Sequence, residues 1–272
     1  MAQVAAEETN KAGSSKLAPS TMRTWRTLSK KIKGTGRKIQ YFLYEPSLFL
    51  PSYSAGELVF VYQEAGKPFE RANILTKVNI NPNSKWCGRC TLKYCGGSRS
   101  TYNVRPKNMV KVIETSSVDM RKVIVTSTTH MYRRLAHSQT FQQDIALEIG
   151  CDFGPTTKVL GEKCLHAIGV DKAWPHIQHA IEANHAENVH FHCVDIFENP
   201  KNILGKYKDL GSPSIVFIDI NGNRELEAVE DAIDLVEKLI TPRLIVVKSV
   251  SLFSSLMYEG GEMVEVGPVY FM

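Results

Sequence analysis

Four acidic residues close successive apolar segments in the second half of the chain, where they can bind a ligand. They are Glu148 in IALEIG, Asp171 after LHAIGV, Asp195 after VHFHCV and Asp219 after SIVFI. Gly150 and Gly154 follow the first acid and allow a ligand to approach the backbone at a strand-to-helix turn. Asp171 lies 21 residues after Gly150, the interval at which a carboxylate meets the ribose of a bound nucleotide.

The segments that must position these acids alternate between strand-like and helix-like patterns. The expected strands are 145–150, 165–171, 189–195, 214–220 and 243–249, and the expected helices are 156–163, 175–186 and 224–239. Apolar strands joined by crossover helices predict an α/β fold with a Rossmann-like, doubly wound, mainly parallel sheet. Such a sheet binds ligands beyond the carboxyl ends of its strands.

The charge is divided between two halves of opposite sign. Residues 1–138 contain 23 Lys/Arg and 8 Asp/Glu, whereas residues 139–272 contain 10 and 20. This asymmetry indicates two structural units, and the basic half suits a polyanion such as nucleic acid. The alternative is a solvated basic face with no such partner.

Residues 1–50 are predicted to form a disordered, basic arm, because the segment begins with a leader poor in bulky apolar residues and carries no acid between Glu8 and Glu45. No apolar run of 18 residues occurs, and the start lacks a signal-peptide pattern. We therefore expect no membrane span and an intracellular location, nuclear or cytoplasmic rather than organellar.

Residues 54–114 are predicted to form a small all-β barrel. Short β-like runs at 56–63, 71–79, 89–94, 100–105 and 109–113 are separated by turns rich in glycine, asparagine and proline. The layout resembles a Tudor-like barrel in its opening Gly-x-Leu-Val-x-Val, its Ala-x-Ile strand and its closing Tyr-Asn-Val-Arg-Pro-x-Asn-Met-Val. Its aromatic residues can line a cage for a methylated side chain, stack on bases or fill the core; they are Tyr62, Trp86, Tyr94 and Tyr102.

Three cysteines of this segment are open to two interpretations. Cys87, Cys90 and Cys95 are reduced structural thiols or, alternatively, part of a zinc site that lacks an obvious fourth ligand. No metal site is expected in the acidic half.

Residues 120–272 resemble the class I S-adenosylmethionine-dependent methyltransferases. The resemblance rests on the acid-x-Gly-x-x-x-Gly motif at Glu148, Gly150 and Gly154, followed by acids at the ends of the next strands. Where many members have a further glycine, this chain has Asp152. The resemblance implies S-adenosyl-L-methionine as cofactor, held by Glu148, Gly150, Cys151, Gly154, Asp171, Lys172, Asp195 and Ile196.

The resemblance also implies which residues act on the methyl acceptor. Asp219 and Lys248 are the candidate catalytic residues, because an acid or a lysine can steer an amine or hydroxyl and manage its proton. Their positions are similar to part of the Lys-Asp-Lys-Glu set of ribose 2′-O-methyltransferases. Lys122 or Arg134 would be its first member and Glu262 or Glu265 its last. Arg133 and Arg134 are candidate substrate-binding residues.

The predicted function is therefore methyl transfer to a macromolecule, with RNA as the first choice. The alternatives are a protein methyltransferase whose barrel docks the substrate, a non-catalytic adaptor that binds S-adenosylmethionine or nucleic acid, and a Rossmann-like domain without a ligand. A nicotinamide dehydrogenase is disfavoured, since Glu148 and Asp152 would repel a pyrophosphate. Few residues follow the last expected strand, so the sheet edge is expected to be incomplete and open to a homodimer partner or to the barrel.

Overall fold

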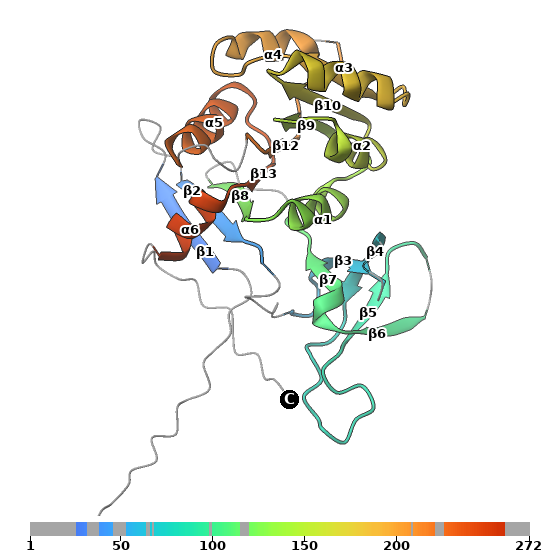
Figure 1. The fold of residues 1–272 in the computed structure, drawn as a ribbon. Helices are drawn as coiled ribbons and strands as arrows, with labels where there is room; N and C mark the ends of the chain where they lie inside the picture. Colours follow the sequence, from blue (N-terminus) through green and yellow to red (C-terminus); the bar gives the residue numbers. More distant parts are fainter. Residues whose placement is uncertain are drawn as a thin grey trace, which may run out of the picture.

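Two sheets organise the protein (Figure 1). The structure is a computed structural model that describes residues 26–31, 38–45, 53–63, 66, 68–97, 100–114, 120–207, 209–220 and 226–258. The large sheet has eight strands in the order β1-β2-β8-β13-β12-β9-β10-β11, and the small sheet has five in the order β6-β5-β4-β3-β7. Along the described parts of the chain, no helix is long and apolar enough to cross a membrane.

The large sheet confirms the predicted Rossmann-like architecture. Its strands that follow the small sheet along the chain are β8 (Met120–Thr126), β9 (Ile145–Ile149), β10 (His166–Asp171), β11 (Val189–Cys193), β12 (Ile215–Ile218) and β13 (Leu244–Lys248). All pair in parallel, as buried strands joined by crossovers do. The sequence prediction missed β8 and the helix α4 (Pro200–Tyr207).

Helices cover both faces of this sheet. Successive residues of a strand point to opposite faces, and because nearly all of them are apolar and buried here, both faces need a covering layer. On one face, Ala146 and Phe217 pack with residues of α1 (Thr129–Gln139) and α2 (Pro155–Gly161), and α3 (Trp174–Ala183) continues this layer beside β11. On the other face, Leu147 and Ile218 pack with α4, α5 (Leu226–Leu239) and α6 (Val250–Tyr258). The fold is therefore a three-layer sandwich.

The predicted disordered arm is wrong for two segments. Residues of β1 (Arg26–Lys31) and β2 (Lys38–Leu43) form an antiparallel pair, and β2 joins the large sheet in parallel with β8. Alternating Ile39, Tyr41 and Leu43 are buried in the core, a period-2 pattern that the surrounding basic residues masked. Residues 1–25, 32–37 and 46–50 of the predicted arm lie outside the described residues.

The expected incomplete sheet edge is also corrected. Beyond β13 the sheet continues through β8, β2 and β1, so its outer strand there is supplied by the N-terminal part of the chain. The edge of β13 is thus not available to a second copy. This topology also inserts the small sheet into the connection between β2 and β8, two parallel neighbours.

The small sheet is antiparallel throughout. Its strands are β3 (Leu58–Tyr62), β4 (Pro68–Ile74), β5 (Cys90–Tyr94), β6 (Thr101–Val104) and β7 (Met109–Lys111), with a short 3-10 turn, η1 (Pro106–Asn108), before the last. Within the described residues β6 and β7 are the two edges and no pairing closes the sheet. The Tudor-like likeness therefore stays a prediction.

The small sheet packs against α1 of the large unit (Figure 1). Phe60 and Tyr62 of β3 share a buried cluster with Leu135 and Ala136 of α1. The Tyr62 hydroxyl donates a hydrogen bond of 2.5 Å to the backbone carbonyl of Arg134, whose guanidinium lies 4.2 Å from the Tyr62 ring centre. Apolar burial and polar contacts thus fix the small sheet on the helix.

Candidate functional site

A cavity of about 660 Å³ opens at the carboxyl ends of the parallel strands. This is where a doubly wound sheet binds ligands, and the volume suits a nucleoside-sized molecule. The structure brings most of the predicted site residues together here. Those lining the cavity are Glu148, Gly150, Cys151, Asp171, Lys172, Asp195, Ile196, Asp219 and Lys248, together with Arg133 from α1.

The turn after β9 brings the backbone close to the neighbouring strand. Gly150 has a φ of 80°, and a Cβ there would lie 2.0 Å from the carbonyl oxygen of Asp219. Only glycine fits this position, because both the left-handed backbone and the close approach exclude a side chain.

Asp152 stands where many class I methyltransferases have a glycine, and it adopts a backbone conformation typical of glycine. Its φ of 52° lies in the left-handed region that glycine prefers and that aspartate tolerates. Its backbone N–H donates a 3.1 Å hydrogen bond to Asp171, and its carboxylate lies 2.8 Å from Nδ1 of His176. The acid therefore ties the turn to the next strand and to α3.

Gly154, a predicted cofactor-binding residue, packs at the start of α2. It caps α2 with a φ of 79° and does not line the cavity. A Cβ there would lie 2.6 Å from the Phe191 ring. The glycine allows α2 and β11 to approach each other.

Asp171 is held firmly at the end of β10. Its Oδ1 accepts a 2.9 Å hydrogen bond from the N–H of Ala173, and its Oδ2 accepts the bond from Asp152. Asp195 is similarly fixed by the N–H of Phe197 at 2.9 Å. Carboxylates oriented by backbone donors keep lone pairs for a ligand's hydroxyl or amino groups.

Glu148 is fully buried below the turn. Its carboxyl accepts a 2.5 Å hydrogen bond from the Thr157 hydroxyl. Burial, with a smaller contribution from nearby Asp219, raises the pKa of Glu148 to about 8. At neutral pH the group is therefore mainly protonated, and it can donate or accept a hydrogen bond at the cavity wall.

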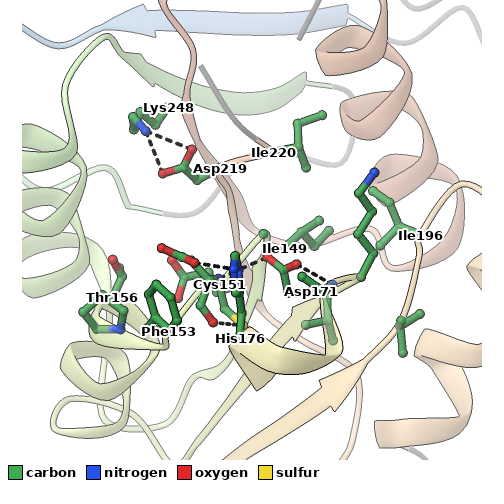
Figure 2. A pocket seen from close by; sticks show the side chains of 18 of the residues that line it. Ile149, Cys151, Phe153, Thr156, Asp171, His176, Ile196, Asp219, Ile220 and Lys248 are labelled. Carbon is green, nitrogen blue, oxygen red and sulfur yellow. Dashed lines mark hydrogen bonds and ion pairs between the residues drawn. The ribbon is translucent and has the colours of Figure 1, made fainter. Parts of the chain in front are cut away.

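Asp219 and Lys248 form an ion pair at the ends of β12 and β13. The Lys248 ammonium lies 2.9 and 3.0 Å from the two carboxylate oxygens, and both side chains are 18% exposed. Figure 2 shows the pair away from Asp171 and Ile196. Three strand spacings separate β13 from β10, which corresponds to about 14 Å.

Several predicted residues lie elsewhere. Arg134 stacks on Tyr62 and donates to the carbonyl of Lys107, so it holds the small sheet rather than a substrate. Lys122 does not line the cavity and donates to the carbonyl of Glu114. Glu262 and Glu265 lie outside the described residues.

Residues that the sequence did not identify complete the cavity. Phe153 is 46% exposed, and its ring centre lies 4.6 Å from that of His176, so the two form an aromatic lip (Figure 2). Thr129 and Phe197 also line the wall. The only signal for these residues was their place just after a strand end or at a helix start.

The donor set of the cavity disfavours a pyrophosphate. Apart from the mainly protonated Glu148, four carboxylates outnumber three cationic side chains; the carboxylates are Asp152, Asp171, Asp195 and Asp219, and the cations are Arg133, Lys172 and Lys248. Pro155 at the first position of α2 removes one N–H that a phosphate would use. A nucleoside with a cationic part, such as S-adenosylmethionine, fits this set better.

The three cysteines of the small sheet are not gathered at one point. Cys90 is buried in the core of the sheet, Cys87 is half-buried and Cys95 is exposed. Within the described residues, no group of three or more His, Cys, Asp or Glu residues could hold a metal ion.

Comparisons with known proteins give distant structural likenesses only. No family model and no curated protein matches the sequence. The chain resembles precorrin 8w decarboxylase from Methanobacterium thermoautotrophicum, with a TM-score of 0.36 and 16% identity over 47% of this chain and 64% of that chain. It resembles Pyrococcus abyssi tRNA (uracil-54, C5)-methyltransferase in complex with S-adenosyl-L-homocysteine, with a TM-score of 0.34 and 12% identity over 86% and 52%. An Escherichia coli oxidoreductase/dehydrogenase of unknown specificity has a TM-score of 0.29 and 10% identity over 86% and 87%.

These likenesses do not choose an activity. The chain spans less than two thirds of the length of the first structures that it matches, at 64%, 42% and 42%. Several further matches carry methyltransferase names. Because the names differ and the TM-scores are low, the function has to be argued from the cavity itself.

Proposed function

We propose that the chain is an S-adenosylmethionine-dependent methyltransferase that acts on RNA. One observation carries the proposal: acids at the ends of four neighbouring parallel strands line one nucleoside-sized cavity, beside a glycine turn that cannot hold a pyrophosphate well. The geometry supports a ligand with hydroxyl, amino and cationic groups.

The residues divide this ligand among the strands. Asp171 accepts from the ribose hydroxyls, and Asp195 with Ile196 holds the adenine. Glu148 and Gly150, which line the same cavity, would hold the methionine part. When bound, the cofactor supplies an electrophilic methyl group on a sulfonium, and the protein mainly aligns the acceptor and excludes water.

The Asp219–Lys248 pair is proposed to receive the acceptor. Asp219 follows β12, two strand spacings from Asp171, and Lys248 ends β13, three spacings away, so an adenosine held by Asp171 leaves the pair near the opposite end of the ligand. Asp219 can accept a hydrogen bond from the acceptor's amine or hydroxyl, while Lys248 keeps the carboxylate in place.

RNA is favoured over protein by charge. Residues 53–114, which include the small sheet, contain 10 Lys/Arg and four Asp/Glu. A polyanion is attracted by such a surface, and each neutralised phosphate steepens the dependence of binding on salt. A protein substrate docked on the small sheet is the second candidate.

Calorimetric titration tests the cofactor. We expect micromolar binding of S-adenosylmethionine and S-adenosylhomocysteine, and none of the reduced nicotinamide cofactor. Asp171→Ala should weaken binding at least about tenfold, since it removes hydrogen bonds to a charged partner. Asp231→Ala, an exposed acid on α5 outside the cavity, serves as the control.

Two results would contradict the proposal. The first is binding of the nicotinamide cofactor alone. The second is binding of S-adenosylhomocysteine that is equal in the wild type and in Asp171→Ala. Transfer of labelled methyl groups to total RNA, and not to protein, tests the substrate class.

A further inference from the structure

A second cavity, of about 430 Å³, lies on the small sheet. Four aromatic side chains line it, each from a different strand: the buried Tyr62 of β3, Phe69 of β4, Tyr94 of β5 and Tyr102 of β6. Phe69 and Tyr102 are 47% and 42% exposed. None of these side chains belongs to the methyltransferase cavity.

The rings of Phe69, Tyr94 and Tyr102 form a row rather than a box. The ring centres of Phe69 and Tyr94 are 5.1 Å apart at 81°, and those of Tyr94 and Tyr102 are 4.9 Å apart at 56°. The neighbouring rings are therefore in contact but tilted to one another, and the row forms an aromatic strip of successive ring faces and edges. Trp86, which the sequence grouped with them, does not line this cavity.

The charges around the strip favour an anion. Arg89 and Arg105 line the same cavity, and Arg89 is anchored by a 3.1 Å bond to the carbonyl of Asn103. The carboxylate of Glu70, also in the lining, accepts a hydrogen bond from the N–H of Gly96. A methylated ammonium would face two guanidinium groups here, whereas a phosphate would be attracted to them.

We propose that this cavity, the aromatic groove, binds unpaired bases of single-stranded RNA. Bases stack on the ring strip while Arg89 and Arg105 contact the flanking phosphates, the combination that recognises single strands. As a statement about the RNA substrate, the inference rests on the proposed function; as a binding site, it stands on the groove alone.

Helix α1 connects the groove to the methyltransferase cavity. Arg133 lines the cavity, and the next residue, Arg134, stacks on Tyr62, which lines the groove. Arg134 also donates to the carbonyl of Lys107, between the groove residues Arg105 and Asn108. RNA held in the groove is therefore presented to the cavity across one helix, at a fixed offset between the bound and the methylated nucleotides.

Fluorescence anisotropy with the full chain and a labelled oligouridylate of about ten nucleotides tests the groove. We expect Tyr102→Ala and Phe69→Ala each to weaken binding about tenfold, because one stacked base is lost. Trp174→Ala, a 56% exposed aromatic on α3 outside both cavities, should bind as the wild type does. Arg105→Gln should lower the salt slope by about 0.7, the contribution of one phosphate.

The outcomes separate this inference from the proposed function. Unchanged affinity for oligouridylate in both Tyr102→Ala and Phe69→Ala would contradict RNA binding in the groove. A trimethyllysine peptide that binds the wild type but not these variants, while their RNA binding is kept, would also contradict it. Binding of S-adenosylhomocysteine is measured on the same samples. If it fails while Tyr102→Ala still weakens RNA binding, the methyltransferase proposal falls and the groove remains.

Discussion

The parallel and the antiparallel sheet gather side chains by different rules. In the large sheet the parallel strands from β8 to β11 end at the same edge, so Asp171, Asp195 and Asp219 meet in one cavity whatever the connecting helices do. In the antiparallel sheet neighbouring strands end at opposite edges, and Tyr94 and Tyr102 meet through cross-strand register instead. The first arrangement concentrates polar groups for chemistry, and the second spreads a surface for recognition.

Removing the Asp219 carboxylate should give the largest effect, and should lower methyl transfer at the large sheet while leaving RNA binding at the small sheet intact. We expect Asp219→Ala to lower single-turnover methyl transfer by about 10²–10⁴-fold, the usual contribution of a positioned acid or base. Affinities for S-adenosylhomocysteine and for oligouridylate should change by less than about threefold. A variant that retains methyl transfer would remove Asp219 from the reaction.

Two glycines with a positive φ, one in each sheet region, test how tightly the backbone around each of them is packed. Gly150→Ala should lower the free energy of unfolding by about 3 kcal/mol or more, because the left-handed conformation and the contact with Asp219 both oppose a Cβ. Gly97→Ala, at a φ of 93° with open space around it, should cost only about 1–2 kcal/mol. Urea unfolding measures both, and equal losses would show that the turn after β9 can relax.

The burial of Glu148 predicts a pH dependence that belongs to the large sheet. Its pKa is about 8 when folded, against a usual value of 4.5, so between these values the folded state holds a proton that the unfolded state has released. The resulting stability is fully present below about pH 4.5 and is lost as the pH rises through 8, at roughly 1.4 kcal/mol per pH unit. Urea unfolding at several pH values should show that Glu148→Gln lacks this dependence. If the free energy of unfolding changed with pH equally in the two proteins, the Glu148 carboxyl would be solvated in the folded state.

Substitution of the neighbouring arginines of α1 should give the smallest effects, one on the small sheet and the other on the cavity. Arg134→Ala removes the stacking on Tyr62 and the bond to Lys107, so we expect a loss of about 1–2 kcal/mol and faster amide exchange in β3 and β7. Arg133→Ala, exposed at the cavity, should leave unfolding within about 0.5 kcal/mol and alter ligand binding instead. Equal amide exchange rates in β3 and β7 of the two variants would show that Arg134 does not stabilise the small sheet.

The sequence predicted the cavity better than the groove. Strand ends are read from local apolar runs, and parallel pairing then places Glu148, Asp171 and Asp219 at one edge. The groove depends on register and loop paths that no local pattern encodes, so Trp86 was grouped with Tyr94 while Phe69 was overlooked.

Two other misses have the same physical origin. Arg134 was assigned to substrate because its contact with Tyr62 joins residues 72 positions apart. Strand β2 was overlooked because its partner β8 lies more than 70 residues later, so that basic composition outweighed a short alternation of apolar residues. Long-range pairing decided both, and a single sequence shows it poorly.

The insertion of the small sheet between β2 and β8 has a consequence for how the chain folds as it is synthesised. The small sheet pairs strands close in sequence, so it can form early, whereas β2 must wait for β8, which itself packs on β13 from near the end of the described chain. During that interval the β1–β2 hairpin carries an unpaired edge that is prone to association with other chains. We therefore expect refolding yield to depend on protein concentration more strongly than native stability does.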